Sequence, residues 1–233
     1  MPRLLISLAL VLVLTPTCRA QDFVFSQAGI TRLLRSDLSS KLIESFPSTL
    51  DEGQKAPVQE NYPEQFYRGI TSFPINHPNL PQALRTQGRI SQIQQTALES
   101  RLHAFRIVAI NNQQPPNDVA TALCSYLLTN LAVYQATSTT SPMSALPVYS
   151  SSDKMKMFKK SRAALEQNTL FLSLTESDKQ EVAEALALHA LLLRDRYKDL
   201  KTNNAAQRGA LHRLTTSNLE LLKGVDNKGA RSR

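Results

Sequence analysis

The sequence predicts an all-α protein, a single irregular bundle of about six helices with a long proline-rich connection near its N-terminus. Apolar side chains recur at steps of three and four residues over several segments, which is the period of an α-helix. No segment alternates apolar and polar residues as a half-buried strand does. The chain of 233 residues also has only seven glycines for tight turns. Helices packed on helices are the architecture that fits these observations.

The first twenty residues have the pattern of a secretory signal. Arg3 precedes a predominantly apolar run, Leu4–Leu14, and Ala20 supplies a small residue before Gln21. This run is too short for a membrane-spanning helix, which needs about 20 apolar residues. We therefore expect residues 1–20 to be removed and the mature chain to be periplasmic or secreted, without a transmembrane span.

Cleavage after Ala20 also decides the cysteine chemistry. It would remove Cys18 and leave Cys124 as the one cysteine, so the mature chain would form no internal disulfide. Cys18 permits an alternative, in which an acylated cysteine becomes the mature N-terminus and anchors the protein to a membrane. The residues before it, Thr15–Thr17, fit that processing badly, because the peptidase prefers a residue such as Gly or Ala beside the cysteine.

Positive charge is concentrated in the C-terminal part of the chain. Removing Arg3 and Arg19 with the signal leaves 25 basic against 19 acidic side chains, a net charge of +6. Residues 21–150 hold nine of each sign, whereas residues 151–233 hold sixteen basic and ten acidic side chains. This asymmetry permits attraction to an anionic envelope component. The alternative interpretation is a solvated face that keeps an exported protein in solution.

The N-terminal part is divided by its prolines. Residues 21–46 are predicted to contain one helix, from about Ala28 to Phe46, which Pro47 ends. Residues 47–89 form a proline-rich connecting segment without sustained periodicity. We expect this segment to pack across the helices, because its aromatic side chains would otherwise remain in water. These side chains are Tyr62, Phe66, Tyr67 and Phe73.

Residues 90–224 are predicted to form the helical core domain. Asn117 or Asp118 is placed to cap its second helix, and Thr175 with Asp178 has the spacing of a capping box before its fourth. A loop rich in serine, threonine and proline is expected over residues 137–152. The tail, residues 225–233, is basic and expected to be disordered. The helices are expected at about residues 90–110, 118–136, 153–171, 176–200 and 203–223.

Four polar residues fall on helix faces that otherwise look buried. Tyr126, Asn130 and Tyr134 follow one another at four-residue steps, and His189 lies on the later helix of residues 176–200. Buried polar groups need hydrogen-bond partners. These residues therefore either bond across the core and fix helix register, or form a small polar pocket between helices that binds a ligand head group.

Five basic residues at the start of the helix predicted over residues 153–171 form a possible anion-binding site. They are too closely spaced to be buried together, so a solvated face is the alternative. The five are Lys154, Lys156, Lys159, Lys160 and Arg162.

The sequence lacks a recognisable catalytic motif. Its four histidines are scattered without metal-ligand spacing, and it has no glycine-rich phosphate loop, nucleophile elbow or His-Glu-x-x-His motif. Cys124 lies in an apolar segment and is expected to be a core residue. We therefore expect no metal, no cofactor and a non-enzymatic binding or interaction module, whose partner is an anionic envelope component or a protein. The alternatives are a peripheral binder of an anionic envelope surface and an enzyme assembled from scattered residues.

Two segments resemble an uncharacterised family of bacterial exported helical proteins. One is Pro-Asn-Asp-Val-Ala-Thr-Ala (116–122), which leads into the helix of Tyr126, and the other is Leu-Thr-Glu-Ser-Asp-Lys-Gln-Glu-Val-Ala-Glu-Ala-Leu (174–186). Residues 67–84 correspond to that family's arginine- and proline-containing lead-in, so the resemblance covers about residues 65–220. The family's core helix is often rich in tryptophan, whereas this chain has none. The resemblance implies export, bacterial origin and an all-helical domain, and it assigns no activity to any residue.

Overall fold

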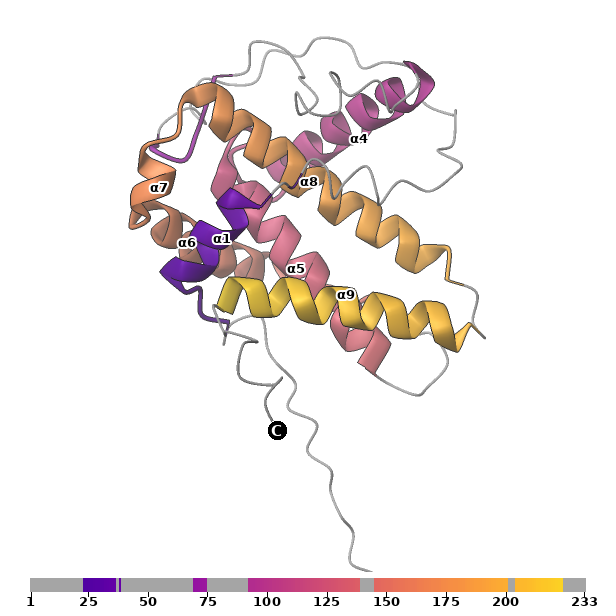
Figure 1. The fold of residues 1–233 in the computed structure, drawn as a ribbon. Coiled ribbons are helices and arrows are strands. Elements are labelled where there is room, and N and C mark those ends of the chain that lie inside the picture. The colour runs from indigo at the N-terminus through magenta and orange to yellow at the C-terminus, as the bar shows by residue number, and fades with distance from the viewer. Residues whose placement is uncertain are drawn as a thin grey trace, which may run out of the picture.

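The computed structural model describes residues 23–36, 38, 69–74, 92–138, 145–200 and 204–223. Within these ranges the regular elements are seven helices (Figure 1), and one isolated antiparallel bridge pairs Ser72 with Asp118. The prediction of an all-α protein is confirmed. The helices are α1 (Gln27–Arg35), α4 (Gln92–Asn111), α5 (Val119–Ser138), α6 (Ser151–Glu166), α7 (Thr169–Leu172), α8 (Glu176–Lys198) and α9 (Ala205–Lys223).

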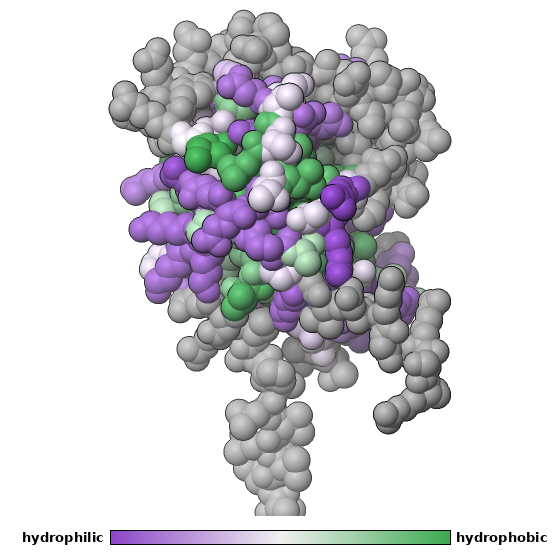
Figure 2. Space-filling model, turned by 60° about the vertical axis from the view of Figure 1, so that its left-hand side comes forward, coloured by the Kyte–Doolittle hydropathy of each residue, from purple (hydrophilic) through white to green (hydrophobic). Residues whose placement is uncertain are grey.

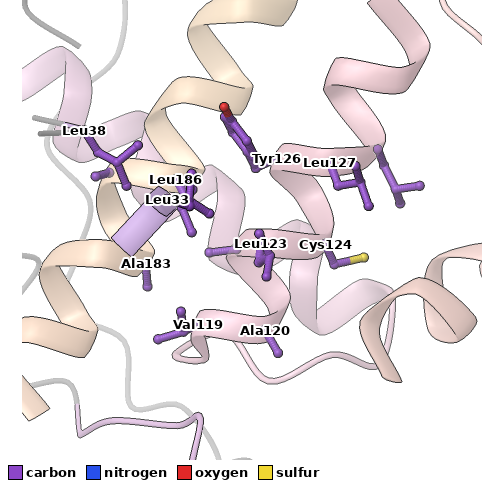
Figure 3. Packing of buried hydrophobic residues seen from close by; sticks show 14 of the residues in the cluster. Leu33, Leu38, Val119, Ala120, Leu123, Cys124, Tyr126, Leu127, Ala183 and Leu186 are labelled. Atoms are coloured by element: carbon purple, nitrogen blue, oxygen red, sulfur yellow. The ribbon is translucent and has the colours of Figure 1, made fainter. Parts of the chain in front are cut away.

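Helix α5 is the centre of the bundle. Fifteen of its 20 residues are buried, and α6, α8 and α9 all pack against it. Figure 1 shows α9 lying across α5, with α6, α7 and α1 grouped at one end of the bundle. The close view in Figure 3 shows core side chains on both sides of α5, with Ala183 and Leu186 toward one side and Leu127 toward the other. An apolar surface on all sides of α5 is what a fully enclosed helix requires.

Asp118 begins α5 and confirms the expected cap. Its Oδ1 accepts hydrogen bonds from the backbone N–H groups of Ala120 and Thr121, at 2.8 and 3.1 Å. Its Oδ2 accepts from the hydroxyls of Thr71 and Ser72, at 2.7 and 2.8 Å. One buried carboxylate therefore caps the central helix and also fixes part of the proline-rich segment against it.

Phe73 confirms that this part of the proline-rich segment packs on the core. Its side chain is buried, and its backbone N–H donates to the Asn117 carbonyl at 3.1 Å. Tyr62, Phe66 and Tyr67, which were expected to pack similarly, lie outside the described residues, as does the predicted tail.

Helix α1 is shorter than predicted. The helix expected from about Ala28 to Phe46 is interrupted, because Ser36 adopts an extended conformation and its hydroxyl and N–H donate to the Leu33 carbonyl at 2.7 and 3.1 Å, so α1 ends at Arg35. Leu38 is helical again, and residues 37 and 39–46 lie outside the described residues. At the other end, the Ser26 hydroxyl caps the helix by accepting from the Gly29 N–H at 2.8 Å. Gly29 lies directly against the backbone of α9 at Leu222, so the absence of a Cβ permits this close approach.

The helix predicted over residues 153–171 is two helices, α6 and α7. Buried Asn168 separates them, since its Oδ1 caps α7 by accepting from the Phe171 N–H at 3.1 Å. Its Nδ2 donates to Oε1 of Gln27 at 3.0 Å and to the hydroxyl of Thr31 at 2.9 Å. The break is therefore stabilised by contacts with α1, far away in the sequence.

The capping box before α8 is confirmed. The Thr175 hydroxyl accepts from the Asp178 N–H at 3.2 Å, and the Asp178 carboxylate accepts from the Thr175 N–H at 3.0 Å. The predicted loop of residues 137–152 is shorter than expected, because α5 continues to Ser138 and α6 begins at Ser151 with Ser150 as its cap. Among the described helices, none is long and apolar enough to cross a membrane.

A buried ion pair joins α4 to α8. Arg106 Nη2 lies 2.8 Å from Glu184 Oε1, and the two side chains are 5% and 3% exposed. Gln180 Nε2 donates to the same carboxylate oxygen at 3.1 Å. Two charges removed from water need this direct pairing and additional hydrogen bonding.

Candidate functional site

A cavity of about 280 Å³ lies between α1, α5, α8 and α9. We name it the tyrosine cavity after Tyr126 of α5, which lines it. The other polar side chains of its wall include His189 and Arg196 of α8 and Asn218 of α9. Two of the four polar residues expected at a pocket, Tyr126 and His189, thus meet at its wall. The rest of the wall is mainly leucine, from Leu33, Leu38, Leu192, Leu193, Leu214 and Leu221.

Tyr126 brings a buried phenol to this cavity. Its side chain projects from α5 away from Cys124 (Figure 3). Its ring meets the His189 ring edge to face, with centroids 6.2 Å apart. Burial raises the pKa of the Tyr126 hydroxyl, so the group stays protonated over the neutral range. Within the described residues the hydroxyl has no hydrogen-bond partner. It can therefore donate one hydrogen bond and accept others.

His189 is oriented by the chain just beyond α1. Its Nε2 lies 2.8 Å from the Leu38 carbonyl oxygen. A carbonyl oxygen only accepts hydrogen bonds, so Nε2 carries a proton and donates it. This contact fixes the imidazole at the cavity wall and connects α8 to the residues that follow α1.

Asn130 is a core residue beside the tyrosine cavity. Its Nδ2 donates to the Tyr126 carbonyl at 2.8 Å, and its Oδ1 accepts from Asn218 Nδ2 at 2.9 Å. The side chain is fully buried. Asn130 therefore fixes the register of α9 on α5 and holds Asn218 at the cavity, which is the hydrogen-bonding role considered for it from sequence.

Tyr134 lies apart from the cavity, although it follows Tyr126 and Asn130 at the same spacing. Its ring stacks on His212 of α9, with centroids 4.8 Å apart and planes inclined by 21°. The His212 Nδ1 lies 3.2 Å from the Thr137 hydroxyl. Tyr134 and His212 thus form a separate contact between α5 and α9.

The charge at the tyrosine cavity is positive. Arg196 is half-buried, and this burial lowers the pKa of its guanidinium, which still remains charged at neutral pH. No acidic side chain is among the described residues of the wall. Arg196 and Asn218 were not predicted as site residues, because no local sequence pattern tells which helices pack together.

The five basic residues of α6 diverge in the structure. Lys156, Lys159 and Lys160 are exposed, and Lys160 Nζ donates to the Phe23 carbonyl at 3.4 Å. Lys154 donates to Asn112 Oδ1 at 3.1 Å, and Arg162 pairs with Glu166 in the same helix at 2.8 Å. Figure 2 turns the end of the bundle that carries α6 and α7 toward the viewer and shows hydrophilic side chains gathered across it.

Cys124 is a buried thiol. Gln114 Nε2 lies 3.9 Å from its Sγ, which itself lies 3.5 Å from the Lys154 carbonyl. Burial raises the pKa of Cys124 to about 12, with smaller opposing effects from Gln114 and Lys154. A protonated thiol is a poor nucleophile. The described residues contain no cluster of three or more His, Cys, Asp or Glu side chains that could hold a metal ion.

The comparisons with known proteins identify the family. A family model described as a family of unknown function, DUF6683, matches residues 74–228. This match covers more than half of the chain, which therefore belongs to that family. No curated protein and no solved structure shows a significant match. The matched range includes Tyr126, His189, Arg196 and Asn218 of the tyrosine cavity, whereas α1 precedes it.

Proposed function

We propose that this protein is an exported, non-enzymatic binding module whose tyrosine cavity takes a small molecule with an apolar body and a polar head group. The observation that carries the proposal is Tyr126, a buried residue on the cavity wall whose hydroxyl forms no hydrogen bond with the described residues. This hydroxyl is therefore open to a hydrogen bond with a ligand that carries a matching polar atom.

The dimensions and lining of the cavity define the class of ligand. A dry cavity of about 150 Å³ holds benzene, so the 280 Å³ here accommodates a ring or short branched chain with several further atoms. Six leucines suit an apolar body. The positive charge of Arg196 and the donor capacity of Tyr126 favour a head group that accepts hydrogen bonds.

The protonation states favour binding over catalysis. A general base must lose its proton near the working pH, but burial keeps the Tyr126 phenol neutral by raising its pKa. The His189 Nε2 proton is already donated to the Leu38 carbonyl. The polar groups of this wall are therefore suited to fixed hydrogen bonding.

A fragment screen observed by NMR tests the proposal. Mature protein labelled in its tyrosine and histidine rings is titrated with a panel of small molecules that each combine an aromatic or branched apolar group with a hydroxyl, amide or carboxylate. We expect the hits to shift the ring resonances of Tyr126 and His189 and to leave Tyr134 unshifted. Hits that shift Tyr134 and leave Tyr126 unchanged, or a complete absence of hits, would contradict the proposal.

Export is the second part of the proposal, and the sequence of residues 1–20 supports it. Expression of the whole chain in a bacterium with an outer membrane should deliver protein to the periplasm or medium with Gln21 as its first residue. N-terminal sequencing measures this directly. Retention of Met1 in cytoplasmic protein would refute export, and an acylated Cys18 would replace cleavage after Ala20 with the lipoprotein alternative.

A second candidate function is binding to an anionic envelope surface through α6. Lys156, Lys159 and Lys160 are exposed at helical steps of three and four residues, so they share one side of the helix. Retention on phosphatidylglycerol vesicles should weaken with added salt, because the Debye length falls from about 10 Å at 0.1 M to about 3 Å at 1 M. Replacing the three lysines with glutamine should abolish retention at an unchanged melting temperature. Retention that survives the substitutions would exclude this surface.

A further inference from the structure

A second cavity, of about 250 Å³, lies on another face of α5, between α4, residues 145–150 and the first turn of α6. Thr121, Ser125 and Thr129 line it from α5, and we name it the hydroxyl cavity after them. At about 100° per residue, each of these three side chains is turned about 40° from the one before, so they form a slanted row along one side of the helix. This row of hydroxyl groups is about 12 Å long, at about 1.5 Å per residue, and Cys124, Leu128 and Ala132 of α5 line the cavity beside it.

These three hydroxyls lack hydrogen bonds among the described residues. Serine and threonine within a helix commonly donate to the carbonyl four residues earlier, as Thr137 does to Val133 at 2.7 Å and Thr215 to Leu211 at 3.0 Å. No such bond forms at Thr121, Ser125 or Thr129. Thr121 is only 1% exposed and its hydroxyl oxygen is buried without a partner. Ser125 and Thr129 are half-buried, so the Thr121 hydroxyl is the buried group of this row whose hydrogen bonding a bound molecule would complete.

The charge of the hydroxyl cavity indicates an anion. Lys154 and Arg194 line it, and its described wall contains no acidic side chain. Lys154 Nζ donates to the neutral amide oxygen of Asn112, so its positive charge is not neutralised there. Arg194 is exposed and forms no ion pair within the described part of the chain.

The remainder of the wall is apolar and partly open to water. Phe105 and Leu128 are buried at the cavity, whereas Val108 and Val148 are 54% and 92% exposed beside it. Exposed apolar side chains that border a cavity are typical of a surface that a ligand covers. The cavity thus combines a hydrogen-bonding edge, an apolar face and two positive charges.

We propose that the hydroxyl cavity binds a small amphiphilic carboxylate of about the size of phenylpropionate. The ring or short chain lies against Phe105 and Leu128, the hydroxyl row hydrogen-bonds its polar edge, and Arg194 or Lys154 pairs with the carboxylate. A benzene-sized ligand needs about 150 Å³, so 250 Å³ leaves room for the additional atoms. This site is separate from the tyrosine cavity and does not depend on the function proposed for it.

Isothermal titration calorimetry of the mature chain with 3-phenylpropionate tests the proposal. The probes with the same ring are neutral 3-phenylpropanamide and cationic 3-phenylpropylamine. We expect the carboxylate to bind most tightly, with an affinity about fivefold or more above that of the amide. Its affinity should fall as salt is added. The proposal would be overturned if the carboxylate and the amide bound equally tightly. It would also be overturned if the carboxylate did not bind at concentrations up to about 10 mM, because even a small ligand should bind more tightly than that.

Matched variants locate the site. Arg194→Gln and Lys154→Gln should each weaken binding of the carboxylate by about fivefold. Thr129→Val removes a hydroxyl at nearly constant shape and should weaken binding by about threefold to tenfold. Lys156→Gln is the control, because Lys156 lies on the same helix as Lys154 and outside the cavity. Tyr126→Phe should leave the affinity unchanged, which separates this site from the tyrosine cavity. Affinity that is the same in Arg194→Gln, Lys154→Gln and the Lys156→Gln control would overturn the assignment.

Discussion

Replacing Arg106 with methionine should destabilise the bundle more than any exposed charge substitution in α4. The change removes a charge and keeps much of the side-chain volume, but it takes the Arg106 cation away from the Glu184 carboxylate, which is 3% exposed. Breaking a buried ion pair from one side costs about 3–5 kcal/mol. In a chain of this size 1 kcal/mol changes the melting temperature by about 2–4 °C, so the expected decrease is about 6–20 °C.

The same two helices provide the control for this measurement. Arg101 of α4 pairs with Asp195 of α8 at 3.2 Å, but these side chains are 24% and 31% exposed. Arg101→Met should therefore cost about 1 kcal/mol or less. Urea unfolding followed by circular dichroism at 222 nm, the helix signal, measures both variants. The double variant Arg106→Met/Glu184→Met should recover most of the loss, because apolar replacement of a whole buried pair is often neutral. Equal losses for Arg106→Met and Arg101→Met would refute the importance given to burial.

Three further predictions use local features of the fold. Thr175→Ala should lower the free energy of unfolding by about 1 kcal/mol through loss of the α8 cap, and an unchanged urea midpoint would remove the capping claim. Gly29→Ala should lower the free energy of unfolding by about 1–3 kcal/mol, because its Cβ would lie 2.6 Å from the Leu222 carbonyl carbon. The control is Gly209→Ala, whose Cβ meets nothing closer than 3.5 Å and which should stabilise the protein by about 0.5–1 kcal/mol. Equal losses of stability in the two variants would refute the close approach. Burial raises the pKa of Cys124 to about 12, so between about pH 9 and 12 the unfolded state loses a proton that the folded state keeps. The free energy of unfolding should therefore fall with rising pH more steeply in the unsubstituted protein than in Cys124→Ala, by about 1.4 kcal/mol per pH unit. Identical alkaline slopes for these two proteins would contradict the buried thiol.

The sequence was sufficient to predict helices wherever local physics determines them. The caps at Asp118 and Thr175 use side chains within three residues of the groups they satisfy, so their spacing alone indicated them. The end of α1 and the break at Asn168 could not be predicted in this way. Asn168 is held by Gln27 and Thr31, more than 130 residues earlier, and no local pattern contains that contact.

The candidate site was predictable only in part for the same reason. Tyr126 and His189 were identified because each is polar on an apolar helix face, but Arg196 and Asn218 depend on how α8 and α9 pack. The prediction that Tyr134 accompanies Tyr126 neglected the rotation of the helix. Each residue advances about 100°, so eight residues turn Tyr134 about 80° away from Tyr126 and move it about 12 Å along the axis. It therefore meets His212 instead of the cavity.

The central claim is that the Tyr126 hydroxyl recognises the head group of a ligand in the tyrosine cavity. The most direct test is the dissociation constant of the strongest fragment hit, measured for the native chain, Tyr126→Phe and Tyr134→Phe. Loss of one hydrogen bond of about 1–1.5 kcal/mol predicts about fivefold to tenfold weaker binding by Tyr126→Phe. Tyr134→Phe, a tyrosine of the same helix outside the cavity, should bind within about twofold of the native chain. Equal dissociation constants for the native chain and Tyr126→Phe would contradict the claim.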